Sequence, residues 1–158
     1  MQALNYAGEE HEKLTDDDVA QLAQALLTNN SFRGELEINC NDLSDLAALH
    51  LAPLFEKQSG QNISKLKVDG NCFTSKAGEY IGGALASNPD YQIKSLSFTG
   101  ICLESIGVTR IVEACNANAH IKRLDIGVLT DRGLQTIANL LRSNTSLEEI
   151  TMQETKDH

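Results

Sequence analysis

The chain has 158 residues, of which 41% are hydrophobic, enough to bury the core of about one domain. Its 13 basic and 22 acidic residues give a formal charge of −9, a sign that repels nucleic acid backbones and anionic lipid. No apolar run approaches the roughly 20 residues of a transmembrane helix, and the N-terminal segment lacks the basic and apolar regions of a secretion signal. We therefore expect a cytoplasmic protein that binds neither nucleic acid nor membrane.

A pair of apolar residues two positions apart recurs along the chain. Its members are Leu36/Ile38, Leu66/Val68, Leu96/Phe98, Leu124/Ile126 and Ile150/Met152, at spacings of 30, 30, 28 and 26. Spacings of this length indicate a repeat protein, and the short alternation predicts one buried strand in each repeat. Leu4 and Tyr6 have the same spacing near the N-terminus, so we expect a degenerate or capping repeat over residues 1–34.

Between these strands the apolar spacing becomes that of a helix. Sets with offsets of 0, 3 and 7 occur as Val19/Leu22/Leu26, Ala48/Leu51/Phe55, Val108/Ile111/Cys115 and Leu134/Ile137/Leu141, and Gly78/Ile81/Leu85 repeats them with a glycine. Each set predicts the buried face of a short amphipathic helix.

Polar residues mark the expected ends of these helices. Residues able to cap the N-termini are Thr15, Ser44, Thr74 and Thr130, with Glu104 at the equivalent place in the third repeat. The chain is expected to turn back after the helices at Asn29, Gln58, Asn88, Asn118 and Asn144. Pro53 falls inside the second predicted helix, where we expect a kink or a short 3₁₀ turn.

The stretches "LEINCNDLS" and "LKVDGNCFT" fit the signature L-x-L-x-x-N-x-L, which resembles the leucine-rich repeat of the ribonuclease-inhibitor-like class. The resemblance implies an α/β fold: a right-handed solenoid, a short horseshoe with a parallel sheet on its concave face and helices on its convex face. We expect residues 1–158 to form a single domain, with four repeats over 35–148 and a terminal strand and tail over 149–158. Ile101 replaces the signature asparagine in the third repeat, and the fourth, "RLDIGVLTDRGL", is shorter and lacks it, so their turns should differ.

In this architecture the concave sheet usually carries function. The exposed positions that flank the buried pairs include Glu35, Glu37, Asn39, Lys65, Lys67, Asp69, Ser97, Thr99, Arg123 and Asp125. Strand spacing should place Glu35 opposite Lys65 and Glu37 opposite Lys67. Two interpretations stay open: the pairs stabilise the sheet, or the stripe binds a protein partner through complementary charge.

Aromatic anchors and reactive groups are scarce in this sequence. Tyr91, in the loop "SNPDYQI", is the tyrosine we expect to be exposed and available as a contact. The four cysteines contain no C-x-x-C pair, so we interpret them as buried free thiols, with a Cys72–Cys102 disulfide open if the geometry permits it. No catalytic constellation or phosphate-binding loop is present in the sequence, and we expect no metal and no cofactor.

We therefore predict a non-catalytic module that binds a protein partner through its concave sheet and ascending loops. The small repeat domain is similar to the C-terminal repeat domain of the tropomodulin family, which implies an actin or cytoskeletal regulator as an alternative. A structural subunit of a larger assembly stays open, and so does a resemblance to the longer Ran GTPase activators. Because the tail "TKDH" offers no amphipathic segment to cover the last repeat, we also expect self-association through an open solenoid end, or a longer chain.

Overall fold

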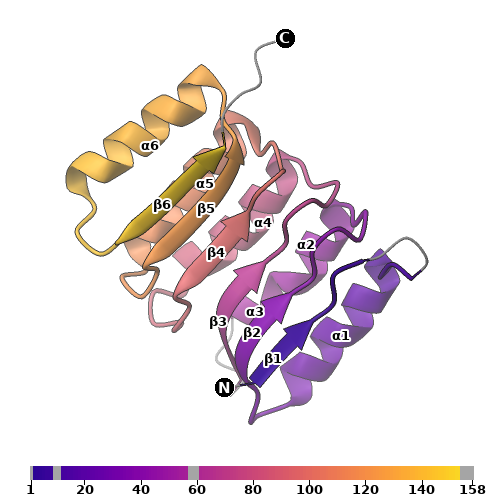
Figure 1. Ribbon diagram of the computed structural model, residues 1–158. Coiled ribbons are helices and arrows are strands. Elements are labelled where there is room, and N and C mark those ends of the chain that lie inside the picture. The colour runs from indigo at the N-terminus through magenta and orange to yellow at the C-terminus, as the bar shows by residue number, and fades with distance from the viewer. Residues whose placement is uncertain (1, 9–11, 57–60, 154–158) are drawn as a thin grey trace.

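The computed structural model describes residues 2–8, 12–56 and 61–153 as an α/β fold built on one parallel sheet (Figure 1). Its strands are β1 (Gln2–Asn5), β2 (Arg33–Glu37), β3 (Asn62–Lys67), β4 (Ser95–Phe98), β5 (Arg123–Val128) and β6 (Glu149–Gln153). Its helices are α1 (Asp16–Thr28), α2 (Asp45–Leu51), α3 (Pro53–Glu56), α4 (Ser75–Ala86), α5 (Glu104–Ala117) and α6 (Asp131–Ser143). The strands lie in chain order, each parallel to its neighbours, as the repeat predicts.

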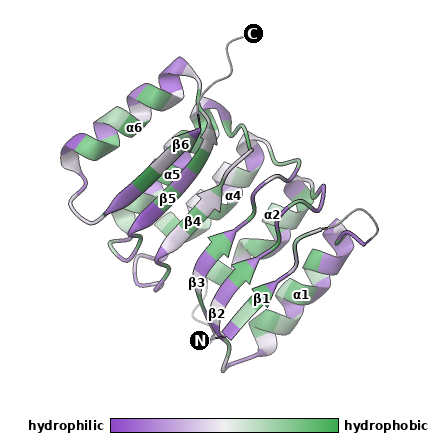
Figure 2. Ribbon diagram, in the orientation of Figure 1, coloured by the Kyte–Doolittle hydropathy of each residue, from purple (hydrophilic) through white to green (hydrophobic). Residues whose placement is uncertain are grey.

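The predicted apolar pairs face the core in all four interior strands. Leu36, Leu66, Leu96 and Leu124 lie side by side in the strand register, and each is fully buried. Figure 2 shows the alternation of hydrophobic and hydrophilic residues along β2 and β3. The helices lie behind or beside the sheet in the view of Figure 1, and no described helix crosses its front. We call this front surface the helix-free face.

The signature asparagines stabilise the turns that follow β2 and β3. The side-chain oxygen of Asn71 accepts hydrogen bonds from the backbone N–H groups of Asn41 and Leu43, and its amide donates to the carbonyls of Ile38 and Val68. Both asparagines are buried, so these bonds satisfy backbone groups that water cannot reach.

The third repeat makes this turn differently, as predicted. Ile101 is buried and makes only a backbone bond, from its N–H to the carbonyl of Phe98. The loop at Ile101 lies against Gly127, where an added Cβ would come within 2.1 Å of the Ile101 carbonyl oxygen. The side-chain oxygen of Gln153 accepts the Gly100 N–H at 2.6 Å. Gly127 thus allows the close approach of this loop, and Gln153 satisfies one of its backbone N–H groups in place of the missing asparagine.

The predicted N-caps are confirmed at Thr15, Ser44, Thr74 and Thr130. The aspartate that begins each of the first two helices also binds the next cap: Asp16 accepts from the backbone and hydroxyl of Ser44, and Asp45 accepts from those of Thr74. The prediction for α5 is wrong. Its N-cap is Leu103, which makes no side-chain cap bond, and Glu104 has a φ of 54° as the first helical residue.

Pro53 divides the second helix as predicted. Helix α2 ends at Leu51, and the short α3 begins at Pro53 itself, because proline has no N–H to donate to the preceding turn. Asparagine side chains close the helix ends: Asn29 accepts from Phe32, and Asn144 accepts from Leu147. Gln58, predicted for the same role, lies outside the described residues.

The predicted buried face of the last helix is partly wrong. Ile137 is buried, but Leu134 and Leu141 are each 51% exposed, whereas Val108 and Cys115 at the same offsets in α5 are 1% exposed. In α5 those positions are covered by the repeat that follows. For α6, no described helix follows β6, and Figure 1 shows α6 at the margin of the molecule.

Candidate protein-binding face

The predicted charged residues lie on the helix-free face in the expected register. Glu35 pairs with Lys65, Lys65 with Ser95, and the row continues to Arg123 and Glu149. The neighbouring row runs from Glu37 through Lys67 and Ser97 to Asp125. The strand pairing thus brings together the residues that sequence spacing assigned to one surface.

The ion pair of Lys65 crosses this register diagonally. Lys65 Nζ lies 2.8 Å from the Glu37 carboxylate, and this hydrogen bond raises the pKa of Lys65 above its usual value although burial opposes the shift. In the described part of the chain Glu35 makes no ion pair, so its predicted contact with Lys65 holds for the backbone register alone. The Glu37 carboxylate also accepts from the side chain of Asn5 on β1 at 2.8 Å. Long side chains can reach diagonal neighbours in a sheet, which explains why Lys65 bonds to Glu37 and not to its register partner Glu35.

Four predicted contact residues instead hydrogen-bond to one another across neighbouring strands. The side-chain oxygen of Asn39 accepts the Asp69 N–H, and Asp69 accepts the Thr99 N–H at 2.7 Å and the Ser97 hydroxyl at 2.7 Å. Ser97 is only 2% exposed. The prediction of Ser97 as an accessible contact is therefore wrong: its small hydroxyl points into the Asp69 carboxylate rather than to solvent.

Lys67 is the cation on this face with the weakest internal partner. Its Nζ lies 3.7 Å from Asp69 Oδ2, beyond hydrogen-bond distance, and its side chain is 36% exposed. Asp69 is already engaged through its other oxygen by Ser97 and Thr99. The Lys67 ammonium therefore keeps donors available to a group outside the chain.

A second charged cluster lies on β5 and β6. Arg123 contacts Asp125 Oδ2 at 3.1 Å and Glu149 at 2.8 Å, and the bond to Asp125 is the main cause of the raised Arg123 pKa. Asp125 Oδ1 is buried and has no hydrogen-bond partner among the described residues. The face therefore has a cationic center on β3 and a mixed, net acidic cluster on β5 and β6.

Tyr91 does not belong to this surface, and its predicted exposure is wrong. It is 4% exposed, its ring meets Phe55 edge to face at 5.3 Å, and its hydroxyl donates to Gln61 and accepts the Ile63 N–H. Burial raises the pKa of Tyr91 to about 12. The loop folds this tyrosine under the sheet because its hydroxyl can satisfy a buried backbone N–H there.

The cysteines also differ from the prediction. Cys115 is buried, and burial raises the pKa of its thiol to about 12. Cys40, Cys72 and Cys102 are exposed, because they lie in the turns after β2, β3 and β4 rather than in the core, and all four are free thiols. The Cys72–Cys102 disulfide is not formed in this structure.

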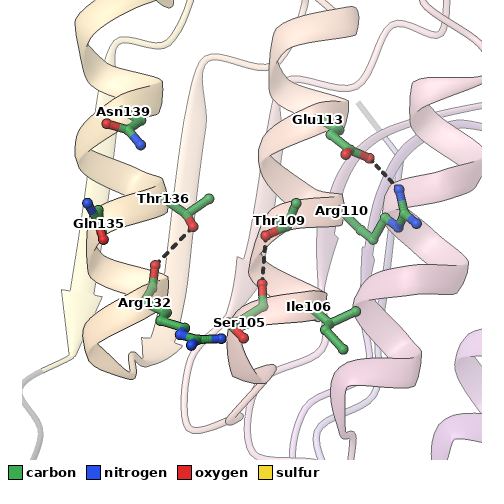
Figure 3. Close-up of a pocket in the computed structure, with 9 residues that line it drawn as sticks. All are labelled: Ser105, Ile106, Thr109, Arg110, Glu113, Arg132, Gln135, Thr136 and Asn139. Carbon is green, nitrogen blue, oxygen red and sulfur yellow. Dashed lines mark hydrogen bonds and ion pairs between the residues drawn. The ribbon is translucent and has the colours of Figure 1, made fainter.

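Sequence reasoning missed a groove of about 580 Å³ between α5 and α6 (Figure 3). It is lined by Ser105, Ile106, Thr109, Arg110, Glu113, Arg132, Gln135, Thr136 and Asn139. Arg110 is held by Glu113 at 2.9 Å, and the threonine hydroxyls donate back to their own helices. Glycines bring the backbones of α4 and α5 into contact, whereas polar side chains of α5 and α6 line the groove on the other side of α5. The sequence hints at this difference: α4 and α5 carry Gly78, Gly82 and Gly107 where they meet, and α6 carries Gly133 alone.

No described helix has the length and apolar character needed to cross a membrane. No family model matches this chain, and no curated protein compared with it matches. Among solved structures, the chain is similar to leiomodin-1 actin-binding site 2, with a TM-score of 0.70 and 19% identity. The similarity covers 90% of this chain and 79% of that one. At this identity it establishes the fold alone: a leucine-rich-repeat-like solenoid.

Proposed function

We propose that the protein is a non-catalytic, cytoplasmic interaction module that binds a protein partner through its helix-free face and the loops that follow the strands. The observation that carries the proposal is the accessible ammonium of Lys67 beside Lys65 on a face whose other groups bond mainly to each other. A partner that presents carboxylates would meet these two lysines, and the acidic residues around them would orient it. The solenoid class that we propose is the right-handed, ribonuclease-inhibitor-like one.

Actin is the specific partner that we propose to test first. The similar solved structure is an actin-binding site of leiomodin-1, and the notion of an actin or cytoskeletal regulator also follows from the resemblance to the tropomodulin repeat domain. A subunit of a larger assembly is the second candidate. GTPase activation is the least supported, because the family that shows it uses a longer horseshoe.

The experiment is co-sedimentation of the purified chain with actin filaments, together with pull-down of monomeric actin. The double variant Lys65→Glu/Lys67→Glu should reduce binding at least about tenfold if the face is the site. Lys76→Glu/Lys94→Glu is the matched control, since it makes the same change of net charge at two exposed residues outside the two charged rows. If the native chain does not bind actin, actin is rejected as the partner. If both double variants bind equally well, the helix-free face is rejected as the binding site.

A further inference from the structure

The outer surface of α6 carries a stripe of exposed and half-buried residues, of which Arg142 donates a hydrogen bond to Asn139 of its own helix at 2.6 Å. Asp131, Leu134, Ala138 and Leu141 follow one another at spacings of 3, 4 and 3, which places them on one side of the helix. Leu134 and Leu141 are each 51% exposed, and Ala138 between them is half-buried. Arg142 follows at the C-terminal end of the same surface. We call these five residues the α6 stripe.

The same positions are buried wherever another repeat follows. Val108 and Cys115 occupy the offsets of Leu134 and Leu141 and are 1% exposed. On the adjoining strand, Met152 is 40% exposed, while its counterpart Ile126 is 1% exposed. In earlier repeats, the positions of Leu134, Leu141 and Met152 are buried against the next repeat. In the last repeat they form an exposed surface with no described helix on it.

The order of residues in the stripe fits a second copy of the same helix. Leu134 and Leu141 lie almost equally far from Ala138, on opposite sides of it along the helix. If two α6 helices cross in antiparallel fashion near Ala138, Leu134 of each copy meets Leu141 of the other. The small side chain of Ala138 allows the close approach at the crossing that helix pairs need.

Charge supports the same arrangement. Asp131 begins α6 and Arg142 lies in its last turn, so an antiparallel pair places each Asp131 near the Arg142 of the second copy. The two contacts are identical by symmetry, as a two-fold interface requires. Antiparallel packing also brings the opposite ends of the helix dipoles together.

We propose that the α6 stripe is a homodimer interface in which two copies pack α6 against α6 about a two-fold axis near Ala138. The interface is on the outer side of the last helix, away from the helix-free face, so dimerisation leaves the proposed partner-binding surface open on both copies. Each dimer would then present that surface twice, and partner binding would gain from two linked contacts.

Sedimentation equilibrium of the full chain over a wide range of concentrations tests the proposal. The native chain should show a monomer–dimer equilibrium, and Leu134→Glu or Leu141→Glu should raise its dissociation constant roughly 100-fold or more, because each would bury a charge. Leu46→Glu is the matched control: Leu46 is 56% exposed on α2, and its change should leave the dissociation constant unaltered.

A charge exchange distinguishes the antiparallel pair from a nonspecific apolar contact. Asp131→Arg alone and Arg142→Asp alone should each weaken the dimer about fivefold or more, because each places like charges together twice. The double exchange Asp131→Arg/Arg142→Asp should restore much of the affinity. Thermal melting of each variant, read as monomer at low concentration, separates loss of association from loss of folding.

Three results would overturn the proposal. They are a native chain that stays monomeric at every concentration, a dimer that tolerates both leucine changes, and a double exchange no tighter than the single ones. A strictly monomeric chain would leave the stripe to a helix of another polypeptide, and a dimer that tolerates the leucine changes would point to pairing at a strand edge.

Discussion

Gly78 of α4 and Gly107 of α5 lie back to back: a Cβ added to Gly78 would come within 2.7 Å of the Gly107 Cα. Gly82 makes a similar approach one turn later, where its Cβ would meet the Arg110 backbone at 2.7 Å. The two helices therefore touch through their backbones. The obstacle to a larger residue is backbone rather than a flexible side chain, so it cannot move aside locally.

Gly78→Ala should destabilise the protein by about 1–3 kcal/mol through overpacking, although alanine favours a helix more than glycine does. Gly83→Ala is the control, because an added Cβ there meets no atom within 4 Å. That variant should be neutral or more stable by about 0.5–1 kcal/mol. Urea unfolding of both variants measures the difference, and equal stabilities would show that α4 and α5 are farther apart than described.

Asn71→Ala should cost about 3 kcal/mol or more, because it removes four hydrogen bonds and leaves buried backbone groups of Asn41, Leu43 and Ile38 with fewer partners. Asn30→Ala, at an exposed residue, should change the free energy of unfolding by less than about 0.5 kcal/mol. The comparison uses denaturant unfolding at neutral pH. A loss at Asn71 no larger than that at Asn30 would contradict the proposed role of the asparagine in its turn.

Tyr91 should make the fold sensitive to alkali. Its pKa is raised from 10.0 to about 12, so its contribution to stability is complete below about pH 10 and is lost as the pH rises toward 12. Tyr91→Phe should cost about 1–3 kcal/mol at pH 7, where the Ile63 N–H loses its acceptor. The gap between native and variant should narrow between pH 10 and pH 12, and a constant gap across that range would contradict a raised pKa.

Thiol reactivity should separate the cysteines into two groups. Cys40, Cys72 and Cys102 are exposed and should react with a thiol reagent in the native protein at pH 8. Cys115 is buried with a pKa raised to about 12, so it should react only when the protein unfolds. Titration before and after addition of denaturant counts the two groups. Rapid reaction of all four thiols in the native protein would show that the Cys115 site opens freely.

The repeat made most of the fold predictable, because positions that face a neighbouring repeat are constrained in the same way each time. The strand pairs and the N-caps at Thr15, Ser44, Thr74 and Thr130 follow from this constraint. Pro53 and Ile101 were recognisable because they depart from it. The exposure of the last helix could not be predicted from the repeat. The offsets of Leu134 and Leu141 predict burial, but these positions are buried only where another repeat covers them.

The sequence predicted which residues lie on the candidate face, but it did not predict which of them bond to each other. Alternation along a strand indicates which side a residue lies on, and the strand register confirmed it for Glu35 and Lys65. It does not indicate that Lys65 reaches diagonally to Glu37, or that Ser97 turns into Asp69. The burial of Tyr91 depends on Gln61 and Phe55, which come from a repeat 30 or more residues earlier, so local composition had no signal for it.

The most direct test of the central proposal is an affinity pull-down from cell lysate with three baits, read by mass spectrometry. The baits are the native chain, Lys65→Glu/Lys67→Glu and the control Lys76→Glu/Lys94→Glu. We predict a protein that the native chain and the control recover equally and that the Lys65/Lys67 variant loses. Recovery of the same proteins at the same levels by all three baits would contradict binding through the helix-free face.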